Sequence, residues 1–253
     1  MTLQSTGSPL PEIAALGPWF HNLHLPDGTQ TAPDHPLGDF PAFKWAQLGP
    51  RLPADLTGWR ALDIGCNAGF YSFELAKRGA EVVGMDADEH YLRQARWAAR
   101  HLGLSGAIDF RCKDVYALGR SDESFDLVLF MGVLYHLRHP LLALDIVAER
   151  VGQLLALQTL TAPAEATLEP PRDLPFSQRH RLREAGWPSM AFVAHRFAGD
   201  PTNWWVPTAG CVEGMARSAG LELVERAGDE IWLYRPRGVA ISVVAELDAA
   251  LGR

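Results

Sequence analysis

The chain has 253 residues, a formal net charge of −7 and a pI near 5.7. A chain of this length can bury the core of one α/β domain with additional segments. The acidic balance argues against a large nucleic-acid footprint, which normally shows as a basic surface. The sequence has no apolar run long enough to cross a membrane, no basic-then-apolar start typical of a secretory signal, and three cysteines without paired or metal-ligand spacing. We therefore expect a cytoplasmic protein without a metal site.

The residues from Ala61 to Asp86 predict a strand, a glycine turn, a helix and a second strand. The apolar run at 61–64 is typical of a buried parallel strand. Gly65 and Gly69 bracket a turn, where a missing Cβ lets the backbone approach a ligand closely. Asp86 follows the second strand, over 82–85, at the edge where α/β sheets bind ligands. The unit therefore indicates a nucleoside-containing cofactor. The predicted helix, over 70–78, would bury Phe70, Phe73 and Ala76.

The turn helps to distinguish between cofactors. The dinucleotide fingerprint needs glycine at the first, third and sixth positions, where Gly65, Asn67 and Phe70 stand, so NAD and FAD are disfavoured. The GK[ST] sequence of phosphate loops is absent as well. The remaining pattern, DxGxNxG from Asp63, resembles motif I of the class I S-adenosylmethionine-dependent methyltransferases. That motif usually has glycine where Asn67 stands, but asparagine tolerates a left-handed backbone. The resemblance implies S-adenosylmethionine, with Asp86 accepting both ribose hydroxyls. The alternative is a glycine turn in another α/β protein.

Helices and strands continue to alternate after this unit. We predict a helix over 88–102, capped by Asp88, and a third strand over 108–111. The apolar run at 125–130 is typical of the centre of a parallel sheet. Pro140 suits the first turn of the next helix, and a fifth strand follows over 154–157. The inward faces predicted for the two helices consist of Tyr91, Leu92, Ala95, Ala99 and Leu102, and of Leu144, Val147 and Val151.

The two ends of the chain predict additions to this sheet. Residues 1–50 are rich in proline, glycine and aromatic residues and are expected to form a lid. Residues 161–205 form an insertion after the fifth strand. Thr208 caps a helix that ends at Gly220, strands over 221–226 and 231–234 form an antiparallel hairpin, and residues 238–253 form a short helix.

These elements define the predicted fold and its boundaries. We predict a Rossmann-like α/β fold with the seven-stranded sheet of class I methyltransferases and helices on both faces. The predicted segments are a lid at 1–50, the cofactor-binding half at 51–160, a substrate-side insertion at 161–205, and the C-terminal helix, hairpin and terminal helix at 206–253.

The run FDLVLFMGVLYHLRHPL at 125–141 resembles the corresponding run of the bacterial tRNA wobble-uridine carboxymethyltransferase family. Phe43-Lys44-Trp45 and Trp205-Val206-Pro207-Thr208 extend the resemblance. The resemblance implies that Met131 contacts the adenosyl group. It also implies that Tyr135 and Lys44 bind the extra carboxylate of a carboxylated S-adenosylmethionine. The family's lysine after a Pro-Trp pair falls at His21, and its C-terminal arginine has no match. An added buried charge needs fixed positive partners, so we expect ordinary S-adenosylmethionine.

The resemblance also places an adenine contact at Asp114, with a solvated loop residue as the alternative. Cys66, inside the turn, is expected to be a small buried filler. The full set of residues predicted to bind the cofactor is Asp63, Gly65, Cys66, Asn67, Gly69, Asp86, Ala87, Asp114, Val115 and Met131.

We expect the substrate at the carboxyl edge of the fourth strand, between lid and insertion. An acceptor that holds its proton at neutral pH needs a general base. His136 and Tyr135 are the candidates, acting directly or through water. Histidine titrates in the useful pH range. The alternatives are that His136 cross-links a loop, that Tyr135 bonds to backbone, and that the tryptophans belong to the core. The predicted substrate residues are His21, Lys44, Tyr135, His139, Asn203, Trp204 and Trp205.

Three hypotheses of function follow. The first is methylation of a small molecule, at oxygen by analogy with the resembling family, which modifies a hydroxyl. The second is modification of tRNA, with the arginines between Arg172 and Arg196 contacting phosphates; a solvated helix and loop is the alternative for that segment. The third is a cofactor-binding or scaffold protein without catalysis. The sequence does not predict an oligomeric state.

Overall fold

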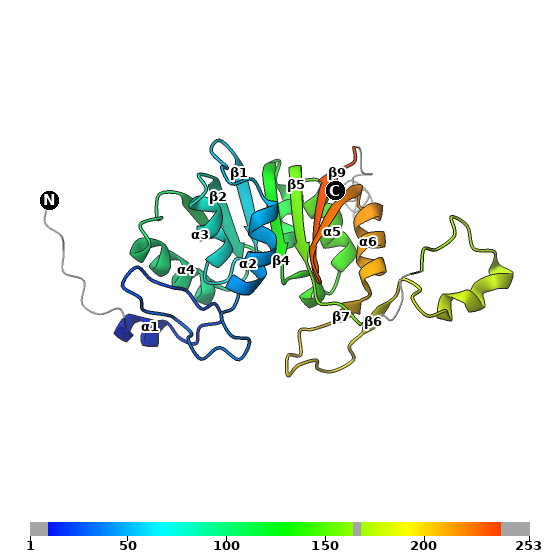
Figure 1. The fold of residues 1–253 in the computed structure, drawn as a ribbon, viewed down its shortest axis with the longest axis horizontal. Helices are drawn as coiled ribbons and strands as arrows, with labels where there is room; N and C mark the ends of the chain where they lie inside the picture. Colours follow the sequence, from blue (N-terminus) through cyan, green and yellow to red (C-terminus); the bar gives the residue numbers. More distant parts are fainter. Residues whose placement is uncertain (1–9, 164–167, 239–253) are drawn as a thin grey trace, which may run out of the picture. The chain divides into compact units, whose positions relative to one another are not determined.

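The structure is a computed structural model that describes residues 10–163 and 168–238. The chain divides into two compact units, Met1–Asp114 and Val115–Arg253. Figure 1 labels the main elements of the two units.

The first unit contains a three-stranded parallel sheet in the order β3-β2-β1. Its strands are β1 (Arg60–Ile64), β2 (Glu81–Asp86) and β3 (Ile108–Cys112). Four of the five β1 residues are buried, because helices cover both faces of a parallel sheet. All three predicted strands are confirmed, and each of their ends agrees with the prediction within one residue. The register pairs Ile64 with Met85 and Asp86 with Cys112, which brings the carboxyl ends of the strands to one edge.

Helices α3 (Phe70–Ala76) and α4 (Glu89–His101) connect these strands. As predicted, Asp88 caps α4, because its Oδ1 atom accepts a hydrogen bond of 2.8 Å from the backbone N–H of His90. Leu92, Ala95 and Ala99 are buried, while Tyr91 and Leu102 are only half-buried. The buried face of α4 instead includes Trp97 and Ala98.

The buried face predicted for α3 is wrong in part. Phe73 is buried, but Phe70 and Ala76 are half-exposed, and Tyr71 and Leu75 are buried in their place. Tyr71 is covered by the N-terminal segment, where the ring of Trp45 lies 6.2 Å away between centroids. The sequence spacing considered only the side toward the sheet, whereas α3 is covered on a second side.

Residues 10–51 form a folded segment with helices α1 (Leu10–Leu16) and α2 (Ala42–Leu48) and the short 3-10 helix η1 (Gly49–Arg51). Gln94 of α4 anchors it, because its Nε2 atom donates to the carbonyl oxygens of Leu16 and Pro18 at 2.8 Å each. The ring of Trp19 meets that of Trp97 edge-on, with 5.5 Å between centroids. The segment is therefore held on α4 by polar and aromatic contacts.

The second unit contains four strands in the order β4-β5-β9-β8. They are β4 (Phe125–Met131), β5 (Val151–Gln158), β8 (Leu221–Gly228) and β9 (Ile231–Pro236). β4 and β5 are parallel, whereas β9 is antiparallel to both β5 and β8. The predicted closing hairpin is therefore confirmed.

In the chain, η2 (Val115–Arg120) precedes β4, α5 (Pro140–Ala148) precedes β5, and α6 (Ala209–Ser218) precedes β8. Leu144 and Val147 are buried on α5 as predicted, but Val151 is the first residue of β5 rather than part of the helix. The apolar spacing continued past the end of α5, because a buried strand follows the helix after two residues. Thr208 caps α6 by accepting a hydrogen bond of 3.4 Å from the N–H of Cys211.

The insertion contributes a two-stranded antiparallel ribbon and a 3-10 helix. The ribbon consists of β6 (Met190–Phe192) and β7 (Trp205–Pro207), and the 3-10 helix is η4 (Phe176–Arg183). The 3-10 helix η4 lies in the long segment between β5 and β6 (Figure 1, yellow-green). The predicted helix at 238–253 lies outside the described residues, apart from its first position. Within the described ranges, no helix has the length and apolar character needed to span a membrane.

The cap on α4 gives a direct test of its contribution to stability. Replacing Asp88 by alanine should lower the free energy of unfolding by about 1 kcal/mol, because the N–H of His90 loses its acceptor. Asp88→Ser, which keeps a capping oxygen, should retain most of the stability. Urea titration followed by circular dichroism would measure both. Equal losses in the two variants would contradict a capping role.

Candidate functional site

The turn after β1 adopts the left-handed conformations that its sequence predicts. Gly65, Asn67 and Gly69 have φ angles of 69°, 48° and 90°. Asn67 thus occupies the position usually filled by glycine, in a backbone region that asparagine tolerates. A Cβ atom at Gly69 would lie 2.7 Å from Cζ of Phe73, so α3 packs directly under the turn. Cys66 is fully buried, as expected of a filler.

Backbone hydrogen bonds fix this turn to the end of β2. The carbonyl oxygen of Met85 accepts from the N–H groups of Gly65 at 2.8 Å and Cys66 at 3.0 Å. The Oδ2 atom of Asp86 accepts from the N–H of Asn67 at 2.9 Å. The turn and the carboxylate that sequence reasoning assigned to one cofactor are therefore in direct contact.

The Asp86 carboxylate is half-buried beside this turn. Its Oδ1 atom accepts a further hydrogen bond of 2.9 Å from the N–H of Asp88. Burial raises the pKa of Asp86, and the backbone N–H donors oppose that shift. Oδ2 accepts a hydrogen bond from the N–H of Asn67 and Oδ1 from that of Asp88, and each oxygen has a second lone pair. The carboxylate can therefore accept hydrogen bonds from a pair of hydroxyls.

Asp63 lies beneath the turn with 1% of its surface exposed. The hydroxyl of Ser72 donates to its Oδ2 atom at 2.7 Å, whereas its Oδ1 atom has no partner among the described residues. Burial raises the pKa of Asp63 to about 7. A buried acceptor without a donor is costly, and it suits a ligand that brings a donor of its own.

The other predicted cofactor residues divide between the two units. Ala87 follows Asp86, and Asp114 is exposed after the end of β3. Val115 and Met131 belong to the second unit, where they are 3% and 6% exposed. Their contacts with a cofactor stay predictions.

His21 of the N-terminal segment lies against α3. Its ring is 6.4 Å from that of Phe70 and 6.3 Å from that of Tyr71. Burial, together with the nearby His35, lowers the pKa of His21 to about 3. The imidazole is therefore neutral at physiological pH and cannot supply the positive charge of a lysine. Lys44, also in the first unit, is half-buried on α2.

Four predicted substrate residues come together in the second unit. Tyr135 lies in the short 3-10 helix η3 (Leu134–His136), directly after β4, and Asn203, Trp204 and Trp205 close the insertion. The N–H of Trp204 donates to the carbonyl oxygen of Tyr135 at 2.9 Å, and Nε1 of Trp205 donates to that of Leu137 at 3.0 Å.

Asn203 and His139 form hydrogen bonds with other residues of the second unit. Asn203 is 7% exposed, and its Nδ2 atom donates to the carbonyl oxygen of Phe197 at 2.9 Å. His139 is exposed, and its N–H donates to the hydroxyl of Tyr116 at 3.3 Å. His139 thus contacts Tyr116 of η2.

His136 and Tyr135 differ sharply as candidate bases. Burial lowers the pKa of His136, opposed by Asp200 and Thr202, so the ring is neutral at pH 7 with a lone pair on one nitrogen. Burial and the carboxylates of Glu230 and Asp200 raise the pKa of Tyr135 to about 12, so its phenol keeps its proton. The electrostatics therefore favour His136 as proton acceptor.

Sequence reasoning missed three residues of this cluster. Nδ1 of His136 lies 2.9 Å from the hydroxyl oxygen of Thr202 and 3.9 Å from Oδ2 of Asp200. The guanidinium of Arg138 lies 4.3 Å from the ring centroid of Trp204. The sequence Asp200-Pro201-Thr202 predicts only a turn. Its position shortly before Trp204 and Trp205 is the one sequence signal that could have placed it in this cluster.

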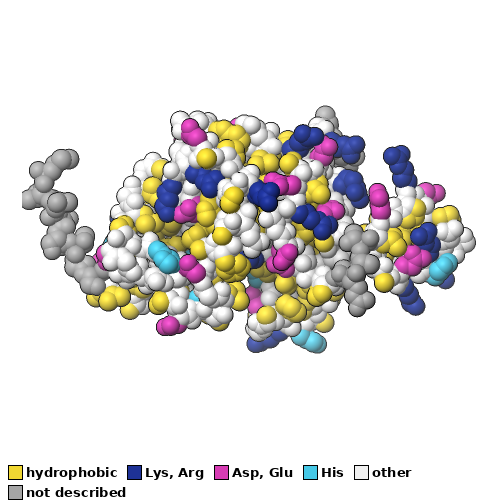
Figure 2. All heavy atoms as spheres, viewed as in Figure 1, with side chains coloured by type: hydrophobic (Ala, Val, Ile, Leu, Met, Phe, Trp, Pro, Cys, Tyr) yellow, Lys and Arg dark blue, Asp and Glu magenta, His cyan; other side chains and the backbone are white. Residues whose placement is uncertain are grey.

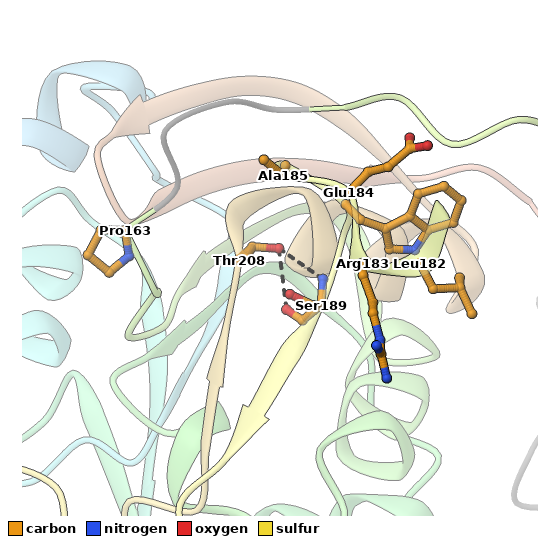
Figure 3. Close-up of a pocket in the computed structure, with 9 residues that line it drawn as sticks. Pro163, Leu182, Arg183, Glu184, Ala185, Ser189 and Thr208 are labelled. Carbon is orange, nitrogen blue, oxygen red and sulfur yellow. Dashed lines mark hydrogen bonds between the residues drawn. The ribbon is translucent and has the colours of Figure 1, made fainter. Parts of the chain in front are cut away.

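A separate hollow in the insertion contains none of the predicted site residues (Figure 3). Its residues include Leu182, Arg183 and Trp187. Thr208 and Ser189 face one another there, and the N–H of Ser189 donates to Oγ1 of Thr208 at 3.1 Å. Because Thr208 already caps α6, these contacts have a structural explanation, and we assign no site to this hollow.

Comparison with known proteins shows what residues 61–153 and the fold are similar to. Those residues match the family described as methyltransferase domain. The N-terminal domain of EvdMO1, solved with SAH bound, has a TM-score of 0.60 at 20% identity and covers 89% of this chain and 92% of its own. Magnesium protoporphyrin IX methyltransferase from Synechocystis, solved with bound SAM, has a TM-score of 0.52 at 17% identity, with 77% of each chain covered. The predicted class I methyltransferase fold is confirmed.

Curated relatives are of two kinds. The chain is 33% identical over 200 residues to the tRNA U34 carboxymethyltransferase of Pseudomonas aeruginosa, covering 76% of this chain and 56% of that protein. It is 42% identical over 87 residues to the ubiquinone biosynthesis O-methyltransferase of Sinorhizobium fredii, covering 34% of each. The predicted resemblance to the tRNA carboxymethyltransferases is confirmed. The chain spans between about a third and somewhat over half of the length of these relatives.

The raised pKa of Asp63 predicts a pH-dependent stability. Between the unfolded pKa near 3.9 and the folded value of about 7, the folded protein binds a proton that the unfolded chain has lost. The free energy of unfolding should therefore fall as pH rises through this window. Asp63→Asn should remove this component, so its stability relative to the natural protein should increase from pH 4 to pH 7.

Urea midpoints measured at several pH values would test this prediction. Asp34→Asn provides an exposed control, whose difference from the natural protein should not vary in the same way. A constant difference for Asp63→Asn across the window would contradict the raised pKa.

Proposed function

We propose that this chain is an S-adenosylmethionine-dependent methyltransferase that acts on an oxygen atom of a small molecule. The observation that carries the proposal is the hydrogen-bonded connection between the left-handed turn and Asp86. It combines a backbone that a ligand can approach closely with a half-buried carboxylate that can accept from two hydroxyls.

The first unit offers complementary groups for several polar parts of this cofactor. Asp86 would accept the ribose hydroxyls, and the unpartnered Oδ1 atom of Asp63 would accept from a donor at the amino-acid end. Asp114 of this unit remains our candidate for the adenine, and the adenosyl contact at Met131 of the second unit stays a prediction. When bound, the cofactor supplies a methyl group that its sulfonium makes electrophilic.

The protein then has to orient the acceptor and exclude water. The cluster around His136, Trp204 and Trp205 supplies an aromatic surface with a neutral imidazole. Oxygen is the preferred acceptor, because one group of relatives is named as O-methyltransferases, and because an imidazole base is useful for a hydroxyl that holds its proton.

Ordinary S-adenosylmethionine is the better fit than a carboxylated form. A carboxylated cofactor would bring an additional negative charge, which needs a positive partner where it is buried. His21, at the position of the family's lysine, is held neutral. Of His21 and Lys44, only Lys44 could therefore supply a positive charge. The segment at 1–50 remains a proposed lid and that at 161–205 a proposed substrate-side insertion. We place the protein in the reducing cytoplasm, where its cysteines would stay free thiols.

A second candidate is tRNA modification, which the relatives named as tRNA U34 carboxymethyltransferases favour. In η4, Arg179 stacks 4.9 Å from the ring centroid of Phe176, which is 79% exposed. Against this function, Arg181 is paired with Glu184 at 3.0 Å, and Figure 2 shows acidic and basic side chains interspersed on the visible face. Failure to bind tRNA at low salt would exclude this candidate.

Calorimetric titration with S-adenosylmethionine tests the leading proposal. The natural protein should bind, and Asp86→Ala should bind about 10- to 100-fold more weakly, because hydrogen bonds to a charged acceptor contribute about 1.5–3 kcal/mol. Asp109→Ala, which removes an exposed carboxylate on β3, serves as the matched control and should bind normally. Unchanged affinity in Asp86→Ala would contradict the proposal. Binding without turnover of any acceptor would favour a non-catalytic protein.

A further inference from the structure

The imidazole of His136 is held from one side by two residues of the insertion. Its Nδ1 atom lies 2.9 Å from Oγ1 of Thr202 and 3.3 Å from the backbone oxygen of the same residue. The hydroxyl of Thr202 lies in turn 2.7 Å from Oδ1 of Asp200 and donates to it. His136, Thr202 and Asp200 therefore form a continuous hydrogen-bonded chain.

These hydrogen bonds determine which ring nitrogen of His136 carries the proton. The backbone oxygen of Thr202 can only accept, and the hydroxyl proton of Thr202 is directed to the Asp200 carboxylate. Both partners of Nδ1 are therefore acceptors, so Nδ1 must carry a hydrogen. The neutral ring then has its lone pair on Nε2. Among the described residues, all hydrogen bonds to the His136 ring involve Nδ1, so Nε2 remains available to a substrate.

The positions of Thr202 and Asp200 are themselves constrained. Asp200 and Phe197 exchange backbone hydrogen bonds of 3.0 and 3.2 Å. The N–H of Thr202 donates to Oδ1 of Asp200 at 2.7 Å. Two residues further on, Trp204 is bound to the backbone oxygen of Tyr135, immediately before the histidine. Backbone hydrogen bonds therefore fix both the loop that holds Asp200 and Thr202 and the residue next to His136, as expected for a base and the groups that orient it.

We propose that Thr202 and Asp200 are positioning residues that hold His136 in the Nδ1–H tautomer, so that Nε2 accepts the proton of the acceptor hydroxyl. This inference rests on the proposed function and specifies its substrate class. The acceptor is a hydroxyl compound, such as a phenol or an enol, that still holds its proton at neutral pH.

The reaction balances with these groups. The O–H bond of the acceptor breaks and its proton passes to Nε2 of His136. The oxygen lone pair forms the new bond to the methyl carbon, while the electron pair of the broken carbon–sulfur bond stays on sulfur. The products are a methyl ether, the demethylated thioether and an imidazolium. Asp200, whose Oδ2 atom lies 3.9 Å from Nδ1, stabilises that imidazolium through Thr202.

The charged and titratable groups around the ring agree with this assignment. Asp200 faces it from the insertion, and Tyr135 lies beside it with 4.2 Å between ring centroids. Glu230, on the turn between β8 and β9, acts on Tyr135 and helps to keep that phenol protonated. The Arg138 guanidinium rests on Trp204. Asp200 is thus the negative charge that faces His136 directly.

Nitrogen-15 NMR of the histidine rings tests the proposal without substrate or cofactor. Long-range correlations distinguish protonated from unprotonated ring nitrogens, and the signals lost in His136→Gln assign this ring. In the natural protein we expect the Nδ1–H tautomer. Thr202→Val, which keeps the backbone oxygen but removes the hydroxyl, should shift the population toward Nε2–H. Asp200→Asn should lower the pKa of His136, because a negative charge is lost. The His139 signals should be unchanged and serve as the internal control.

Two results would overturn the proposal: an Nε2–H tautomer in the natural protein, or an unchanged tautomer and titration in both variants. Binding of S-adenosylmethionine, measured by calorimetry on the same samples, keeps this test separate from the proposed function. Normal binding with the wrong tautomer rejects the positioning role alone. Absence of binding rejects the proposed function, whatever the tautomer.

Discussion

The hydrogen bond from the Asn67 N–H to the Asp86 carboxylate is the interaction on which the candidate cofactor site depends. It joins the turn after β1 to the end of β2, where the carbonyl of Met85 also receives two N–H groups of the turn. Because Asp86 is half-buried, its charge acts in a medium of lower dielectric than water. The same carboxylate therefore stabilises the left-handed turn and presents acceptors to a ligand.

A comparable constraint governs the loop after β4. The end of the insertion is bonded to the backbone of residues 135 and 137, and this arrangement decides the chemistry of two adjacent side chains. Tyr135 is kept as a neutral phenol, while His136 is kept as a neutral imidazole with its Nδ1 atom engaged. The binding and proton transfer that we propose would thus depend on backbone contacts that fix the side chains before any ligand arrives, which is the usual source of preorganisation.

Local signals explain which features could be predicted from the sequence. The strands around Ala61 and Leu127, the cap at Asp88 and the turn at Asn67 depend on residues close together in the chain, so pattern and propensity suffice. The burial of Tyr71 depends on Trp45 and His21 in the N-terminal segment, and the tautomer of His136 depends on Thr202, 66 residues away. Such long-range contacts, like the neutral state of His21, follow only from the tertiary structure.

A crystal structure with S-adenosylhomocysteine would test the central claim most directly. The account predicts both ribose hydroxyls within hydrogen-bonding distance of the Asp86 carboxylate, with the backbone of residues 65–69 against the ligand. A ligand bound elsewhere, or a ribose that does not contact Asp86, would contradict it.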